Sequence, residues 1–392
     1  MITDPVAITI VLAAVVWVAL RLEERFRLFK ALGAALVGIL LGMVLSNSGL
    51  LPDTSPAYEF LMGPAVSAGV ALILLSVDLR SVRVAGPKML LAFLVGAAGS
   101  TIGAMVAGFF LAGMIGPETW KLTGQFTGTY IGGGLNFAAL GQALDTSSDL
   151  FTAAVAADVV VTAIWMMACL SAPILLSRAA RQSVRRSPGE LEKETSPPDP
   201  MGKDTPPTLE KTLYGTGYPM PLRDGAALVT IALGAVWGAE RLGALVPFLP
   251  EVLWLTTLVL IVAQIPAVKG LVGGAMWGNY LILLFLASNG ARSVISNIVE
   301  VGPAVFYFAM ATVAIHGLAI FGIGRLFKID LPTLAVASQA NVGGAASAMA
   351  MATARGYADR LLPGVAVGLL GYAVGNYAGF AVAALARTIL GG

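Results

Sequence analysis

The sequence predicts an all-α polytopic membrane protein of two inverted repeats, each with five transmembrane helices and one glycine-broken segment. Hydrophobic residues make up 57% of the 392 residues and charged residues only 12%, whereas a soluble chain carries about 25% charge. Ten apolar runs fall five on each side of a polar stretch in mid-chain. The fourth run of each half is followed by a segment whose glycines and polar residues are unsuited to lipid, 123–143 and 334–353.

The ten apolar runs are candidate transmembrane helices, because about 20 apolar residues cross a bilayer. They cover 6–20, 31–51, 60–77, 89–115 and 150–176 in the first half, and 225–239, 252–268, 271–288, 304–326 and 361–386 in the second. Both halves place Gly-Pro before the fourth run, at Gly86-Pro87 and Gly302-Pro303. Asp4 stands where a signal peptide has a basic region, so we expect the first helix to be retained.

The polar stretch between the halves is rich in Pro, Glu, Lys and Thr. Such a composition cannot bury enough apolar area to fold, so we expect residues 179–222 to be a disordered linker. The two repeats are then 1–178 and 223–392. The linker carries no recognisable binding motif, and a passive tether is the role we favour.

The distribution of Lys and Arg indicates the topology. If each broken segment re-enters on its own side, the chain crosses ten times, and 20 of the 24 basic residues fall on one side. If both segments cross fully, the same residues divide 13 against 11. The positive-inside rule favours the first arrangement. We therefore expect both termini outside and the linker in the cytoplasm, in the plasma (bacterial cytoplasmic) membrane; a helix break inside each segment is equally compatible.

The broken segments supply the candidate substrate site, because their polar side chains are neutral oxygens and amides suited to hydrogen-bonding a solute. The candidates are Thr127, Thr129, Asn136, Gln339, Asn341 and Ser347. Glycine permits close backbone approach and positive φ, and the freed carbonyls and helix N-termini of such breaks hold cations and anions. This makes Gly132, Gly133, Gly343 and Gly344 ion-coupling candidates. The alternative is that the glycines serve packing and the polar groups satisfy freed backbone.

Asp158 is the one carboxylate well inside an apolar run. An acid there costs roughly 2.5–3.5 kcal/mol on insertion scales, which makes it a functional candidate. We expect it to bind Na+ together with carbonyls of the breaks, or to carry a proton, with Asn376 adding an amide; the alternative is a buried structural acid. His316 is expected to be a hydrogen-bonded neutral imidazole rather than a proton shuttle.

The last apolar run carries a stripe of glycines that allows another helix to approach closely, at Gly364, Gly368, Gly371, Gly375 and Gly379. We expect this stripe to pack against the second broken segment and to have no chemical role.

Three stretches carry a family resemblance: GTYIGGGLNFAAL at 128–140, Ala-Asp-Val at 157–159 and SQANVGGAASAMA at 338–350. Together they resemble the domain of unknown function 819 family, over almost the whole chain except the linker. The layout is more distantly similar to sodium/glutamate and citrate symporters, bile-acid symporters and cation/proton antiporters. This resemblance implies a fixed scaffold domain, a moving core transport domain that contains both broken segments, and a homodimer formed through the scaffold.

The same resemblance bears on the site. The glutamate and citrate symporters carry Gly-Gly at each re-entrant tip, which Gly132-Gly133-Gly134 and Gly343-Gly344 match. The antiporters carry an acid where Asp158 stands. Their frequent second acid or Asn is replaced here by Ala157 and Val159, a departure that weakens the antiporter interpretation.

These observations favour a secondary active transporter, coupled to Na+ or H+, that carries a small polar or anionic organic solute by an elevator-like alternating-access mechanism. The alternative is a monovalent cation/proton antiporter without organic substrate. We expect no enzyme, because one histidine and one mid-span acid supply no hydrolase constellation. ATP-driven transport is disfavoured by the absence of a P-loop, and a net charge of +2 gives no indication of nucleic-acid binding. Bound Na+ is the one cofactor-like species expected.

Overall fold

The computed structural model describes residues 2–52, 54–183, 220–246 and 249–390, all of it helix, turn or irregular chain without a strand. Seven helices in these ranges are long and apolar enough to span a membrane. They are Pro5–Arg25, Pro56–Leu74, Leu79–Ile115, Ser148–Ala172, Leu222–Leu245, Ile295–Leu326 and Ala358–Leu390. The protein is therefore an all-helical, multi-pass membrane protein.

The first half of the chain contains α1 (Pro5–Arg25), α2 (Arg27–Asn47), α3 (Pro56–Phe60), η1 (Leu61–Ala65), α4 (Val66–Leu74), η2 (Leu79–Ser81), α5 (Val82–Ile115), α6 (Thr119–Gly132), α7 (Gly134–Ala143) and α8 (Ser148–Ser183). The second half contains α10 (Leu222–Leu245), α11 (Glu251–Ala263), α12 (Pro266–Lys269), α13 (Gly274–Ala291), α14 (Ile295–Leu318), η3 (Ala319–Ile323), α15 (Gly324–Leu326), α16 (Leu331–Val342), α17 (Gly344–Ala354) and α18 (Ala358–Leu390). Most of the expected linker lies outside the described residues, and α8 continues to Ser183.

All ten predicted runs are mainly helical, but three of them fall short of a full apolar span in the described chain. In α2 the chain leaves helical geometry at Gly33, whose φ is 75°, so that the apolar part is Leu32–Asn47. The helix α11 ends at Ala263, three residues before Pro266, whose missing N–H and ring oppose continuation. In α13 only 18 residues are helical, and Ser288 and Asn289 lie in its last turn.

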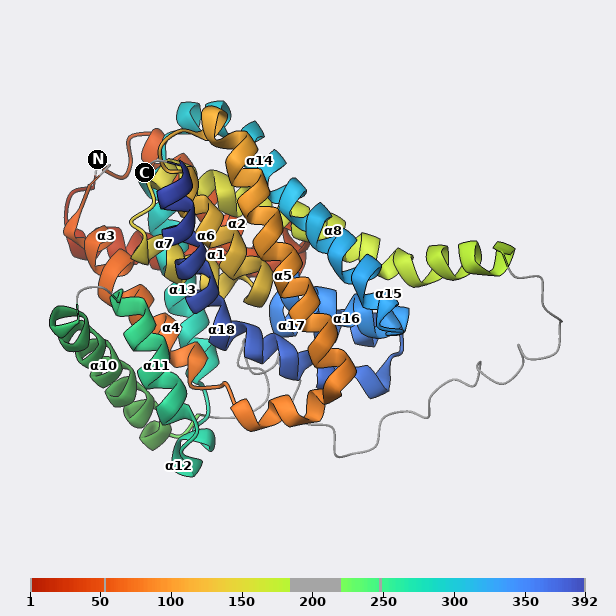
Figure 1. The fold of residues 1–392 in the computed structure, drawn as a ribbon. Helices are drawn as coiled ribbons and strands as arrows, with labels where there is room; N and C mark the ends of the chain where they lie inside the picture. Colours follow the sequence, from red (N-terminus) through yellow and green to blue (C-terminus); the bar gives the residue numbers. More distant parts are fainter. Residues whose placement is uncertain (1, 53, 184–219, 247–248, 391–392) are drawn as a thin grey trace.

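The contacts between helices divide them into two groups; Figure 1 shows α10, α11 and α12 together at the lower left and α8, α15 and α16 at the right. In what we call the first bundle, α2 packs on α1 and α13, α4 packs on α13 and α10, and α10 packs on α11. In the second bundle, α5 packs on α14, α6, α16 and α18, while α8 packs on α14 and α16. Aromatic contacts connect the bundles, since the Phe151 ring of α8 packs in a tilted arrangement on Phe137 of α7 and edge-on against Phe285 of α13.

Within the described residues, two connectors join the bundles, from α4 to α5 and from α13 to α14, and each is held by a side-chain amide of the first bundle. The first is held by Gln264, directly after α11. Its Nε2 donates to the Val77 carbonyl at 3.1 Å, and its Oε1 accepts from the Leu79 N–H at 3.1 Å.

Asn47, at the end of α2, holds the second connector in the same pattern. Its Nδ2 donates to the Ser293 carbonyl at 2.9 Å, and its Oδ1 lies 3.5 Å from the Ile295 nitrogen. In both connectors the side-chain amide therefore contacts the carbonyl of one residue and the N–H of the residue two positions later.

The Gly-Pro pairs that follow the connectors differ in conformation. Gly86 has φ 71° and ψ 165°, so α5 bends there and its long straight part begins at Pro87. Gly302 and Pro303 lie inside α14, which is helical from Ile295 to Leu318 without a break. The glycine of the Gly-Pro pair thus interrupts helical geometry in the first half of the chain and is helical in the second.

Candidate functional site

Two helix breaks meet inside the second bundle. Gly133, with φ 86°, separates α6 from α7, and Gly343 separates α16 from α17, which begins at Gly344 with φ 74°. A Cβ placed on Gly133 would lie 3.2 Å from the Gly344 nitrogen and 3.3 Å from the Gly343 carbonyl carbon. This approach needs glycine on both sides, since a side chain on either would push the segments apart.

The breaks bring four helix ends to one place. The carbonyl ends of α6 and α16 carry partial negative charge, and the N–H ends of α7 and α17 carry partial positive charge. The helix α6 is buried from Leu122 to Gly132 and α16 from Thr333 to Val342. In contrast, Gly134 is exposed, a Cβ placed on it would meet no atom within 4 Å, and Gly343 is half-buried. The accessible side of the meeting point is therefore at Gly134, where α7 begins, and at Gly343, between α16 and α17.

Three of the six predicted substrate residues carry buried polar atoms without a regular hydrogen bond. They are Thr129 Oγ1, Asn136 Oδ1 and both amide atoms of Gln339, beside which the Cys169 thiol lies. The Asn136 Nδ2 is occupied, because it donates to the Gly371 carbonyl at 3.1 Å and the Gly128 carbonyl at 3.3 Å. A buried polar atom left unpaired costs about 1–3 kcal/mol, so these atoms are the ones a ligand would satisfy.

The other three predicted substrate residues have different surroundings. Thr127 donates to the Thr123 carbonyl of its own helix at 2.8 Å. The Asn341 amide, oriented by its hydrogen bonds, donates to the carbonyls of Phe93 and Ala337 at 3.2 Å each. Thr127 and Asn341 therefore have structural partners, while Ser347 is half-buried beside Gly343.

Asp158, in α8, lies beside the last turn of α6. Thr162 Oγ1 donates to its carboxylate at 3.3 Å, and the Tyr130 hydroxyl is directed at it without reaching regular hydrogen-bond geometry. Two hydroxyls, and no cationic side chain of the described chain, thus act on this acid. The sequence indicated Asp158 through its position in an apolar run, but gave no sign that Tyr130 would face it.

Asn376 is directed away from the breaks, toward the first bundle. Its Nδ2 donates to Thr256 Oγ1 of α11 at 3.1 Å, and the neighbouring Tyr377 hydroxyl lies 2.7 Å from Thr257 Oγ1. The sequence grouped Asn376 with Asp158, whereas the structure places it at the contact between α18 and α11.

The glycine stripe of α18 packs against both broken segments, so the prediction of the second alone was incomplete. A Cβ on Gly368 would lie 2.5 Å from the Ala345 Cα in α17. Further along, a Cβ on Gly375 would lie 2.9 Å from the Gly128 carbonyl oxygen, and one on Gly379 would lie 2.7 Å from that of Gly124. The second half of the stripe thus fits α6, because α18 is long enough to continue past the meeting point and along this helix.

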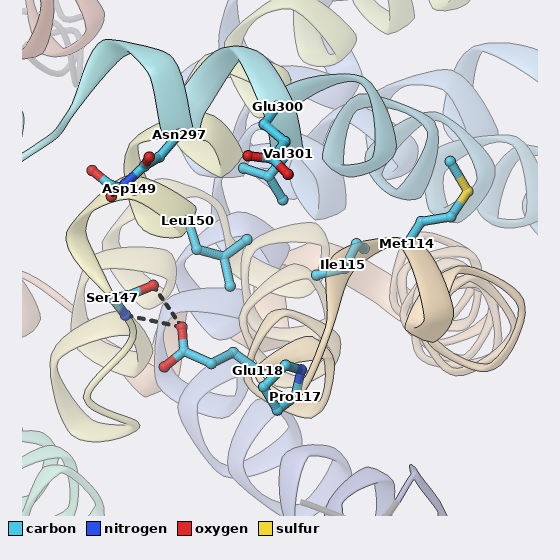
Figure 2. A pocket seen from close by; sticks show the side chains of 10 residues that line it. All are labelled: Met114, Ile115, Pro117, Glu118, Ser147, Asp149, Leu150, Asn297, Glu300 and Val301. Carbon is cyan, nitrogen blue, oxygen red and sulfur yellow. Dashed lines mark hydrogen bonds between the residues drawn. The ribbon is translucent and has the colours of Figure 1, made fainter.

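A cavity of about 350 Å³ lies elsewhere, where α5 ends and α6, α8 and α14 begin (Figure 2). Glu118, Asp149 and Glu300 give it an acidic lining. Ser147 donates to Glu118 through its N–H at 3.2 Å and its hydroxyl at 2.6 Å. Asp149 accepts from the Val294 N–H at 2.6 Å. Glu118 and Asp149 therefore hold the loops at this end of the helices in place.

The fold and the site together define a multi-pass helical membrane protein with two glycine-separated helix pairs that meet in its interior. The sequence profile of the family described as "Protein of unknown function (DUF819)" matches residues 6–389, and the chain belongs to this family. It is also 30% identical over 380 residues to the uncharacterized membrane protein YjcL of Bacillus subtilis (strain 168), with 93% of each chain covered. The family resemblance seen in the sequence motifs is confirmed.

Proposed function

We propose that the protein is a secondary active transporter, coupled to Na+ or H+, for a small polar or anionic organic solute. The observation that carries the proposal is the contact between Gly133 and Gly343–Gly344, with unpartnered polar atoms buried beside it. Paired broken helices in the two halves of a chain are typical of transporter binding sites, where irregular backbone lines a cavity. The solute would bind between the breaks, using Thr129, Asn136 and Gln339, with Ser347 at the accessible edge.

The segments 123–143 and 334–353 contain no charged residue, so the helix ends provide the local field. The N–H ends of α7 and α17 favour an anionic group of the solute. The carbonyl ends of α6 and α16 and the Asp158 carboxylate favour a cation, which makes Na+ held by oxygens, or a proton on Asp158, the coupling ion. The ion drives transport to the extent that it binds one conformation better than the other.

Alternating exposure would follow from motion of the second bundle, as core, against the first bundle, as scaffold. Two features support a relation between the halves. Gln264 and Asn47 hold the two connectors through the same pattern of amide hydrogen bonds, and both halves contain a Gly-Pro pair. In an inverted repeat, exchanging the conformations of the halves gives the opposite-facing state. The bend would accordingly alternate between Gly86 and Gly302. The charge distribution supports ten crossings with the linker in the cytoplasm, and the homodimer rests on the family resemblance alone.

A monovalent cation/proton antiporter is the second candidate. It is favoured by the surroundings of Asp158, where two hydroxyls leave the carboxylate free to exchange one cation for another. The proposal assigns the protein no catalytic reaction in either case.

Proteoliposomes on a solid-supported membrane distinguish these functions. Sodium or pH jumps are applied with and without a panel of organic acids, amino acids and sugars, after a thermal-shift screen has selected the panel. Currents that require an added solute support the symporter, and currents with ions alone support the antiporter. Absence of both, from protein whose melting transition is intact, would contradict ion-coupled transport.

A further inference from the structure

His316, in α14, is fully buried and contacts α5 and α16 at once. Its Nδ1 lies 2.9 Å from the Gly96 carbonyl oxygen, and its Nε2 lies 2.8 Å from Ser338 Oγ. A carbonyl oxygen only accepts, so Nδ1 carries the proton and Nε2 accepts from the serine hydroxyl. The hydrogen-bond network thus assigns one tautomer, with both ring nitrogens engaged.

The bonds of His316 extend to both broken helix pairs. Ser100 Oγ lies 3.0 Å from Nδ1 and donates to the Tyr130 carbonyl at 2.7 Å, in the last turn of α6. On the other side, Ser338 precedes Gln339 in α16, and its hydroxyl also accepts from Trp165 Nε1 at 2.8 Å. A single imidazole therefore joins the turn before the first break to the turn before the second.

The packing of α5 is shaped to this side chain. A Cβ on Gly96 would lie 2.9 Å from His316 Cε1, and a Cβ on Gly99 would lie 3.1 Å from His316 Cα. These glycines let α14 approach closely enough for the imidazole to reach the α5 backbone. This is an observation independent of the hydrogen bonds.

We propose that His316 is a positioning residue, which holds α6 and α16 in the register at which their breaks meet. The link acts through Ser100 on α6 and through Ser338 on α16. The importance of this register for transport rests on the proposed function. The register itself is a matter of geometry and can be measured whether or not the protein carries a solute.

The test is the rate at which cysteines at Gly134 and Ala346, which flank the meeting point, are joined by a short bismaleimide in a Cys169→Ala background. An asparagine amide reaches the place of Nδ1 and a glutamine amide that of Nε2. His316→Asn therefore keeps the bond to Gly96, His316→Gln keeps the bond to Ser338, and His316→Ala keeps neither. We expect each amide variant, which loses one hydrogen bond, to slow cross-linking by about two- to tenfold, and His316→Ala, which loses both, to slow it more.

The control is Thr312→Ala, one turn earlier in α14, where the hydroxyl bonds only to the Phe308 carbonyl of its own helix. It should leave the cross-linking rate unchanged. Melting temperatures are recorded in parallel, since a residue that only fills space would lower stability without altering the register. If His316→Ala does not fold, Ser100→Ala combined with Ser338→Ala cuts the same links. An unchanged rate in the folded His316→Ala variant, or in this double variant, would overturn the proposal. A failure of solute transport alone would affect only the proposed function.

Discussion

If the helix bends at Gly86 in one conformation and at Gly302 in the other, alanine substitutions at these two glycines should have opposite effects. A Cβ added at either glycine would meet no atom within 4 Å, so the substitutions act on the backbone and not through clashes. At Gly86, φ 71° and ψ 165° lie in a region almost restricted to glycine, and alanine there costs about 1–3 kcal/mol. Gly86→Ala should therefore lower the ratio of the present to the alternative conformation by about 5- to 150-fold.

At Gly302 the backbone is already helical, and alanine favours helix over glycine by about 1 kcal/mol. Gly302→Ala should therefore raise the ratio of the present to the alternative conformation by about fivefold or more. The assay is double electron–electron resonance between nitroxides at Glu59 of the first bundle and Gly113 of the second, both exposed, in a Cys169→Ala background. Opposite shifts between two distance populations are expected. Shifts in the same direction, or a single population in both variants, would refute the alternation.

Three further predictions concern the site and its supports. Asp158→Asn should abolish ion dependence without lowering the melting temperature, and ion-driven uptake at normal stoichiometry in this variant would remove Asp158 from the mechanism. Gly132→Ala should destabilise the protein by about 1–3 kcal/mol by overpacking, because its Cβ would clash with the Gly371 carbonyl. Gly134→Ala is the control, since its Cβ would meet no atom within 4 Å. Equal melting temperatures of the two variants would contradict the close packing. Outside the membrane, the hydrogen bond from Lys269 lowers the pKa of Asp78 below 3.8. This stabilisation is present above the ordinary pKa and is lost as the pH falls through the lowered one. Asp78→Asn should therefore reduce the loss of stability at acid pH by on the order of 0.5 kcal/mol, measured as melting temperature against pH. An unchanged pH dependence would exclude the ion pair as a contributor.

The fold could be predicted from the sequence wherever a pattern was long. The apolar runs gave all the major helices, because twenty apolar residues in a row have few alternatives to a membrane helix. The backbone conformation of single residues could not be predicted: the sequence does not show that Gly33 leaves helical geometry while Gly302 does not. The residues next to the two glycines in the sequence do not distinguish these conformations.

The candidate site was predicted in position but not in detail. The glycine pairs at 132–133 and 343–344 marked the breaks, since no other residue allows such a backbone approach. Which polar side chains lack partners was not predictable. Asn341 is engaged by Phe93 of α5, while Gln339 two residues earlier is not. His316 likewise acquires its partners from α5 and α16, which are distant in sequence, so its role can be read only from the assembled helices.

The central claim is that the meeting point of the two breaks is exposed alternately to the two sides of the membrane. A single cysteine at Gly134, in a Cys169→Ala background, tests it most directly, because this residue is exposed at the start of α7. In vesicles of known orientation, its reactivity toward a membrane-impermeant maleimide is measured from each side in turn. The account predicts that the cysteine reacts from both sides, with the ratio shifted by Na+ or pH. Reaction from one side only, whatever the ions present, would contradict it.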